Sequence, residues 1–141
     1  MADADETTVF IVEDHEVVRT MLVQLIDRTP GLSVSGVVAT AEEALAAIPA
    51  CQPHLVLVDL SLPGMDGTVL IQALHQRYPD LLILAVSGHD ETLYAAAALS
   101  AGAQGYIMKE DSIQIPEAIR RLRRGERYVS DQLRSEFDDL E

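Results

Sequence analysis

The chain has 141 residues, of which 48% are hydrophobic, with two Phe, four Tyr and no Trp. This length fits one domain with a core of aliphatic side chains. Ten basic residues against 23 acidic ones give a formal net charge of −13, which repels polyanions and argues against nucleic-acid binding by this chain alone.

Neither export nor membrane insertion is indicated. The apolar runs are only a few residues long, and the first residues, MADADETT, carry acids where a signal peptide would carry Lys or Arg. A cytoplasmic protein with no membrane partner is therefore expected. The single cysteine, Cys51, cannot form an internal disulfide, and we expect it to be structural.

Hydrophobic periodicity predicts five strands alternating with five helices, after an acidic extension over residues 1–7. The strands are expected at 8–12, 32–39, 55–59, 81–87 and 105–108. The first four helices are expected at 15–28, 41–49, 68–78 and 90–101. The fifth helix should begin between Ser112 and Pro116 and end at Gly125.

Turn and cap residues mark the ends of several elements. Pro30 and Gly31 are expected to end the first helix. Thr40, with Glu43 three residues later, forms a capping box for the second helix. Proline is tolerated only in the first turn of a helix, so Pro116 should lie near the start of the fifth.

Strands that alternate with helices imply right-handed crossovers and a parallel sheet covered on both faces. The sequence therefore predicts an α/β domain over residues 8–125, with a doubly wound, five-stranded parallel sheet.

Residues 126–141 are expected to form a tail or linker. A short helix capped by Ser130 is predicted there. Its apolar stripe consists of Leu133, Phe137 and Leu140.

The stretch LVLVDLSLPGMDG, residues 55–67, is an apolar strand followed at once by a carboxylate and a turn. Asp59 thus stands at the carboxyl end of a buried parallel strand, where open sheets place ligand chemistry, although an acid there can also simply cap a turn. Glu13 and Asp14 follow the first strand in the same way. If these strands are neighbours, three carboxylates converge, and their repulsion requires a cation or proton. Oxygen ligands favour Mg²⁺ or Mn²⁺.

Two more predicted strands also end in polar groups. Ser87 ends the fourth strand, and Lys109, the only lysine in the chain, follows the fifth. A lysine offers a mobile positive charge on a long stem, suited to a phosphoryl oxygen. Together with Asp59 and a divalent ion, these groups are what phosphorylation of an aspartate requires.

The motifs VFIVEDHEVVR, LVLVDLSLPGMDG, ILAVSGHD and AGAQGYIMKE occur in an order and spacing that resemble the receiver domain of bacterial two-component response regulators. The resemblance implies a flavodoxin-like (βα)5 fold. It implies that Asp59 accepts a phosphoryl group from a sensor histidine kinase. It also implies that Asp14, Asp59 and the backbone carbonyl of Ser61 bind Mg²⁺, with Glu13 acting through water.

The same resemblance implies a conformational switch. Ser87 and Tyr106 match the family's switch pair, and Lys109 matches its phosphate-contacting lysine. Two positions depart from the family pattern. Glu13 stands where Asp is commoner, and Glu110 stands where many receivers have a cis proline, so this loop is expected to differ in shape.

The segment RRGERYVSDQL, with VEDHEVVR and QGYIMK, is similar to the NarL/FixJ subfamily, whose receivers precede a LuxR-type DNA-binding domain. The chain is therefore expected to be a receiver fragment or a stand-alone receiver that forms homodimers on phosphorylation and controls transcription through a domain absent here. Five basic residues fall between Arg120 and Arg127; either a solvated helix face or a docking surface explains them.

Three alternatives are open. A phosphatase of the haloacid dehalogenase type needs a second acid two residues after its nucleophile, where this chain has Ser61. A nucleotide- or flavin-binding module needs a glycine-rich phosphate loop after the first strand, where Glu13 and Asp14 stand instead. A receiver that signals without phosphorylation is disfavoured by the complete set of groups. We therefore expect no enzyme, but a phosphoacceptor with at most self-phosphotransfer and autodephosphorylation.

Overall fold

The computed structural model describes residues 6–60, 67–88 and 92–130, and of residues 92–94 the backbone only. The described strands are β1 (Thr7–Val12), β2 (Leu32–Val38), β3 (Leu55–Asp59), β4 (Leu82–Ser87), β5 (Gly105–Met108) and β6 (Tyr128–Val129). The described helices are α1 (Glu16–Asp27), α2 (Ala41–Cys51), α3 (Gly67–Arg77), α4 (Thr92–Ala101), α5 (Ile115–Arg123) and the 3₁₀ helix η1 (Lys109–Gln114).

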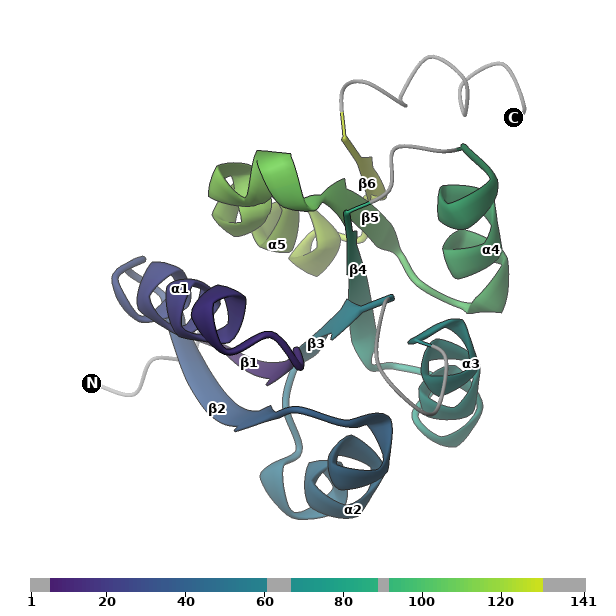
Figure 1. The fold of residues 1–141 in the computed structure, drawn as a ribbon, viewed down its shortest axis with the longest axis horizontal. Helices are drawn as coiled ribbons and strands as arrows, with labels where there is room; N and C mark the ends of the chain where they lie inside the picture. Colours follow the sequence, from purple (N-terminus) through teal and green to yellow (C-terminus); the bar gives the residue numbers. More distant parts are fainter. Residues whose placement is uncertain (1–5, 61–66, 89–91, 131–141) are drawn as a thin grey trace.

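The strands form one parallel sheet in the order β2-β1-β3-β4-β5-β6. Helices α1 and α5 cover one face, and α2, α3 and α4 cover the other (Figure 1). The predicted doubly wound α/β fold is confirmed. Because the strands are parallel, their carboxyl ends all lie at the same edge of the sheet. The candidate residues are at or just after the ends of β1, β3, β4 and β5.

The expectation of a five-stranded sheet was wrong, because the described part of the chain has a sixth strand. After α5, Gly125 adopts a positive φ of 87° and turns the chain back. Tyr128 and Val129 then pair in parallel with Gly105 and Tyr106. Two residues are too few to show an alternating pattern, so sequence periodicity could not detect this strand.

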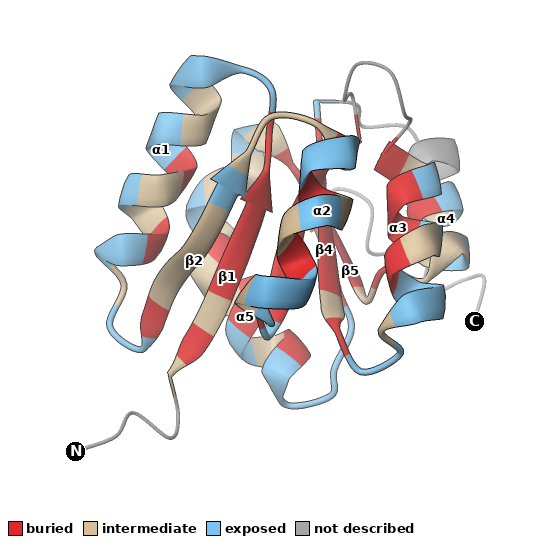
Figure 2. Ribbon diagram, turned by 90° about the horizontal axis from the view of Figure 1, so that it is seen from below, coloured by how far each residue is buried: buried red, intermediate tan, exposed pale blue. Residues whose placement is uncertain are grey.

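The strands alternate their side chains between two apolar cores, as the β pleat requires. On β3, Val56 and Val58 pack toward α2, α3 and α4, whereas Leu55 and Leu57 pack toward α1 and α5. Figure 2 shows that the inner strands are mostly buried, that the edge strand β2 is mostly of intermediate burial, and that the outer faces of the helices are exposed. The double covering explains why β3 is apolar at each of its positions except Asp59.

The predicted pairing of Thr40 with Glu43 at the helix start is confirmed, with one difference from a regular capping box: the Glu43 N–H donates to Thr40 Oγ1 at 3.1 Å, but Glu43 Oε1 accepts from the N–H of Ala39, one residue before the cap, at 3.2 Å. The predicted end of this helix near Pro49 is too early, since α2 continues to Cys51. A proline in the last turn removes one backbone hydrogen bond but does not prevent two further helical residues.

The fifth helix begins at Ile115, inside the predicted window, with Pro116 in its first turn. The segment before it, from Lys109 to Gln114, forms η1, which the sequence did not suggest. No helix within the described ranges is long and apolar enough to cross a membrane. The expected start of the helix at residue 90 and the tail helix with Leu133, Phe137 and Leu140 lie outside the described residues.

Candidate functional site

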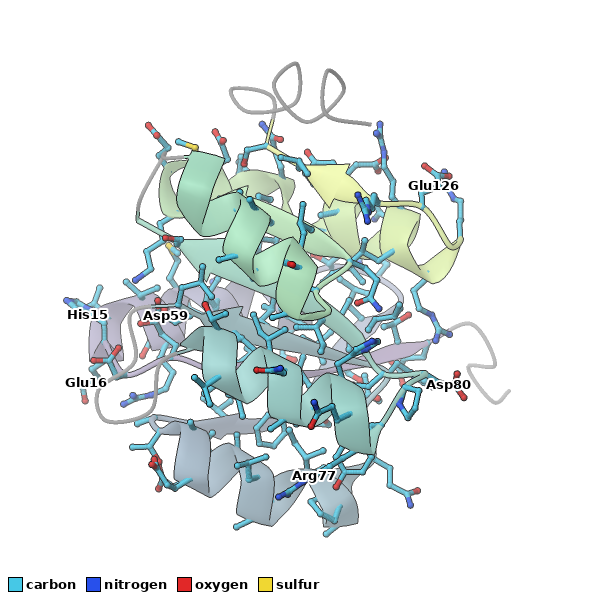
Figure 3. All side chains as sticks on the ribbon, turned by 90° about the vertical axis from the view of Figure 1, so that its right-hand side faces the viewer. His15, Glu16, Asp59, Arg77, Asp80 and Glu126 are labelled. Carbon is cyan, nitrogen blue, oxygen red and sulfur yellow. The ribbon has the colours of Figure 1, made fainter. Side chains whose placement is uncertain are left out.

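Three carboxylates meet at the carboxyl edge of the sheet. Strands β1 and β3 are neighbours, so Glu13 and Asp14, just after β1, lie beside Asp59 at the end of β3. One carboxylate oxygen of each lies within 4.8 Å of the others. Figure 3 shows Asp59 at the same end of the molecule as His15 and Glu16, far from Asp80. The predicted convergence of the three acids is confirmed.

Lys109 reaches the two buried acids of this cluster from beyond β5. Its Nζ lies 3.5 Å from Asp59 Oδ2 and 3.6 Å from Glu13 Oε1. Both carboxylate side chains are only 1% exposed, whereas the lysine side chain is 30% exposed. Strand β4 separates β5 from β3, so only a long side chain spans this distance. The lysine partly offsets the negative charge and remains open to solvent.

The pKa of Glu13 is strongly perturbed. Burial, and then its contact with the carboxyl group of Asp59, raise the pKa of Glu13 from 4.5 to about 7. The His15 N–H and the positive charge of Lys109 act in the opposite direction. Glu13 Oε2 accepts a hydrogen bond from the His15 N–H at 3.1 Å, but within the described residues Oε1 accepts none. A buried carboxylate oxygen that accepts no hydrogen bond from the described residues and has only the ion pair with Lys109, beside two more carboxylates, fits a hard divalent cation.

The loop after β1 is held by a residue that sequence reasoning missed. Arg19, in the first turns of α1, donates from Nη1 to the carbonyl oxygens of Glu13 at 3.0 Å and Asp14 at 3.3 Å. Arg19 follows the two acids by six and five residues. This spacing could have suggested the contact, because a long side chain in the first turns of a helix can reach the loop that precedes the helix. His15 caps the same helix by accepting from the Val18 N–H at 3.5 Å.

The other expected residues occupy the same region. Ser87 ends β4 and is buried, and Tyr106 on β5 is fully buried in the core beneath α2, α3 and α4. The ring of Tyr106 therefore lies inside the domain in this structure. Ser61, whose carbonyl is implied as a metal ligand, lies outside the described residues. The roles of these residues remain predictions.

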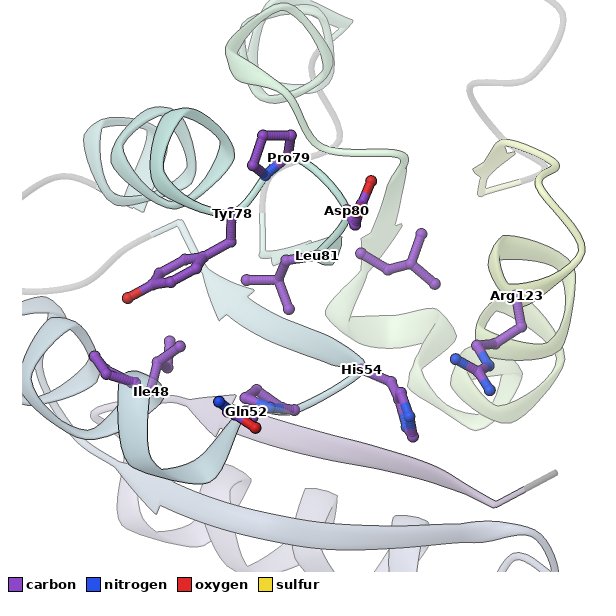
Figure 4. A pocket seen from close by; sticks show the side chains of 11 residues that line it. Ile48, Gln52, His54, Tyr78, Pro79, Asp80, Leu81 and Arg123 are labelled. Atoms are coloured by element: carbon purple, nitrogen blue, oxygen red, sulfur yellow. The ribbon is translucent and has the colours of Figure 1, made fainter. Parts of the chain in front are cut away.

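A groove of about 850 Å³ lies at the opposite, amino-terminal edge of the sheet (Figure 4). Tyr78 and Leu81 contribute to its apolar wall, and His54, Asp80 and Arg123 line it as well. Burial and the positive charge of Arg123 lower the pKa of His54. Of the described residues that line this groove, Asp80 is the only one with a carboxylate, whereas the opposite edge of the sheet gathers three.

Comparison with known proteins identifies the family of this chain. Residues 9–120 match the response regulator receiver domain, and the chain belongs to this family. A two-component response regulator of the LuxR family from Aurantimonas sp. SI85-9A1 superposes with a TM-score of 0.90 at 31% identity, covering 96% of this chain and 97% of that one. The predicted similarity to receivers of the LuxR-type subfamily is thereby confirmed.

Two curated relatives are longer than this chain. The response regulator GacA of Pseudomonas protegens is 33% identical over 126 residues, which are 89% of this chain and 59% of that protein. The DNA-binding transcriptional activator DevR/DosR of Mycobacterium tuberculosis is 39% identical over 102 residues, which are 72% of this chain and 47% of that protein. The chain thus spans roughly half of the length of these relatives.

Proposed function

We propose that this chain takes a phosphoryl group from the phosphohistidine of a sensor histidine kinase onto Asp59. The observation that carries the proposal is the buried carboxylate of Asp59, 3.5 Å from the only lysine and within 4.8 Å of two further acids. A structural carboxylate at a strand end needs neither a lysine nor an acidic neighbour. A phosphoacceptor benefits from both, since the lysine neutralises phosphoryl charge and the neighbouring acids hold a cation.

In the transfer step, a carboxylate oxygen of Asp59 attacks phosphorus and forms an acyl P–O bond. The P–N bond to the imidazole breaks, and the imidazole nitrogen keeps its electron pair. Lys109 lies where its Nζ can donate to a phosphoryl oxygen once it leaves the Asp59 carboxylate.

Asp14 and Asp59 would hold Mg²⁺, or Mn²⁺, with the backbone carbonyl of Ser61 as a further expected ligand and Glu13 acting through water. When bound, such an ion would neutralise negative charge on the carboxylates and on the phosphoryl oxygens. Glu13 must then lose the proton that its raised pKa retains, so cation binding should release protons near neutral pH.

We further propose that Ser87 and Tyr106 form the switch. The hydroxyl of Ser87 would donate to a phosphoryl oxygen, and the ring of Tyr106, which is buried in this structure, would occupy the space behind it. One charge-assisted hydrogen bond contributes roughly 1.5–3 kcal/mol, which shifts a two-state equilibrium tenfold or more. Ser87→Ala should therefore uncouple phosphorylation from ring position, as measured by the ring resonances of Tyr106. Unchanged resonance shifts in this variant would contradict the switch.

The output is proposed to be transcription, through a DNA-binding domain outside this chain, because the chain is similar to part of DevR/DosR, a DNA-binding transcriptional activator. Phosphorylation should promote weak homodimers of the receiver. With a net charge of −13, residues 1–141 alone should not bind DNA measurably at physiological salt. Sedimentation with and without a phosphoryl mimic, and a DNA titration, test these two statements.

The phosphoacceptor is tested by incubating the chain with acetyl phosphate and Mg²⁺ and measuring the intact mass. The wild type should gain one phosphoryl group, and Asp59→Asn should gain none. Asp80→Asn, which removes an exposed acid at the other end of the sheet, is the matched control and should label normally. Equal labelling of Asp59→Asn would refute the assignment, and steady phosphate release from unrelated phosphomonoesters would indicate a phosphatase instead.

A further inference from the structure

The guanidinium group of Arg19 hydrogen-bonds to backbone carbonyl groups rather than to a carboxylate. Its Nη1 donates to two carbonyl oxygens, those of Glu13 at 3.0 Å and Asp14 at 3.3 Å. Within the described residues no carboxylate oxygen lies within 4.0 Å of this guanidinium. The side chain is half-buried against the loop. A strongly acidic chain thus places an arginine beside its acidic cluster, where it forms no ion pair with a described residue.

The two bonded carbonyls belong to Glu13 and Asp14, which supply two of the three carboxylates of the acidic cluster. One nitrogen that bonds both carbonyls fixes the two successive peptide units, and with them the directions in which the side chains of Glu13 and Asp14 leave the backbone. Hydrogen bonds from a charged donor are shorter and stronger than neutral ones. This restraint opposes the tendency of the acids to separate by mutual repulsion.

The loop and α1 form one connected unit. The Arg19 N–H donates to the His15 carbonyl at 2.8 Å, and the His15 N–H donates to Glu13 Oε2 at 3.1 Å. The side chain of Arg19 in turn donates to the carbonyl oxygen of Glu13, so the three residues are linked by hydrogen bonds. The position of the Glu13 carboxylate therefore depends on a contact made from the helix.

We propose that Arg19 is a positioning residue for the divalent-cation site: it holds the loop after β1 so that Glu13 and Asp14 face Asp59 before the cation arrives. The proposal rests on the proposed function. Arg19 itself contacts neither cation nor phosphoryl group. Residues that orient metal ligands from outside the ligand set typically change metal affinity by about 10-fold to 100-fold when they are removed.

The test compares Arg19→Gln with Arg28→Gln by calorimetric titration of Mg²⁺. Arg28 is an exposed residue at the other end of α1, so both variants lose one positive charge from the same helix and change the net charge of the chain equally. Arg19→Gln should weaken Mg²⁺ binding about 10-fold or more, while Arg28→Gln should stay within about twofold of the wild type. Equal affinities in the two variants would overturn the proposal, because net charge alone would then explain any change.

A second measurement is independent of the cation. In metal-free protein, the His15 amide should exchange with solvent faster in Arg19→Gln than in Arg28→Gln, since its hydrogen bond to Glu13 depends on the loop being held. Unchanged exchange would overturn the positioning role even if affinity falls. If the wild type neither binds Mg²⁺ nor labels at Asp59, the proposed function fails, whereas faster exchange in Arg19→Gln would still show that Arg19 holds the loop.

Discussion

Replacing Glu13 with Gln is expected to remove a pH-dependent loss of stability from the metal-free protein. The pKa of Glu13 is raised to about 7 in the folded chain from a usual value of 4.5. Between these values the folded state retains a proton that the unfolded state releases. The free energy of unfolding should therefore fall as pH rises from 4.5 to 7, and the whole loss should be present above pH 7.

The magnitude follows from the shift. Each pKa unit corresponds to about 1.4 kcal/mol, so the ionised Glu13 carboxylate destabilises the metal-free fold by about 3 kcal/mol above pH 7. An amide has nearly the same shape and carries no charge. Glu13→Gln should thus be similar to the wild type near pH 5 and more stable by a few kcal/mol near pH 8.

Urea unfolding followed by far-UV circular dichroism, in EDTA at pH 5 and pH 8, measures this effect. The lowered pKa of His54 acts in the opposite direction, because its loss of stability occurs as pH falls, but it is common to both proteins and cancels in the difference between them. Glu42→Gln, an exposed acid on α2, is the matched control and should show no such difference. A Glu13→Gln difference that is equal at the two pH values would refute the reasoning.

Three further substitutions have defined expectations. Lys109→Ala should still label with acetyl phosphate, but its amide resonances should shift less than those of the wild type when beryllofluoride is added, because the positive charge that would move to contact the phosphoryl group is removed. Shifts as large as in the wild type would contradict this. Gly36→Ala should lower the free energy of unfolding by about 1–3 kcal/mol, because the added Cβ would lie 2.6 Å from the Phe10 ring, and an unchanged urea midpoint would contradict it. Ser130→Ala should cost about 1–3 kcal/mol, because the buried Met108 N–H donates to Ser130 Oγ at 3.0 Å; exchange of the Met108 amide should accelerate, and unaltered protection would count against this role.

The sequence by itself determined the alternation of strands and helices and the residues at the strand ends. These features follow from local physics: apolar runs such as 55–58 require burial on both faces, and Thr40 with Glu43 satisfies backbone groups only a few residues away. Asp59 could be recognised in the same way, because the first polar group after a buried strand lies at the sheet edge.

Only the tertiary structure decided which strand ends meet. The neighbouring positions of β1 and β3 place Glu13 beside Asp59, and this proximity with burial sets the pKa of Glu13. The pairing of β6 with β5 was likewise absent from the sequence pattern, and the contact of Arg19 with the acidic loop was compatible with its spacing but was shown only by the structure. Periodicity reports whether a residue is buried, whereas charge interactions and strand pairing depend on distances between segments that only the packed chain fixes.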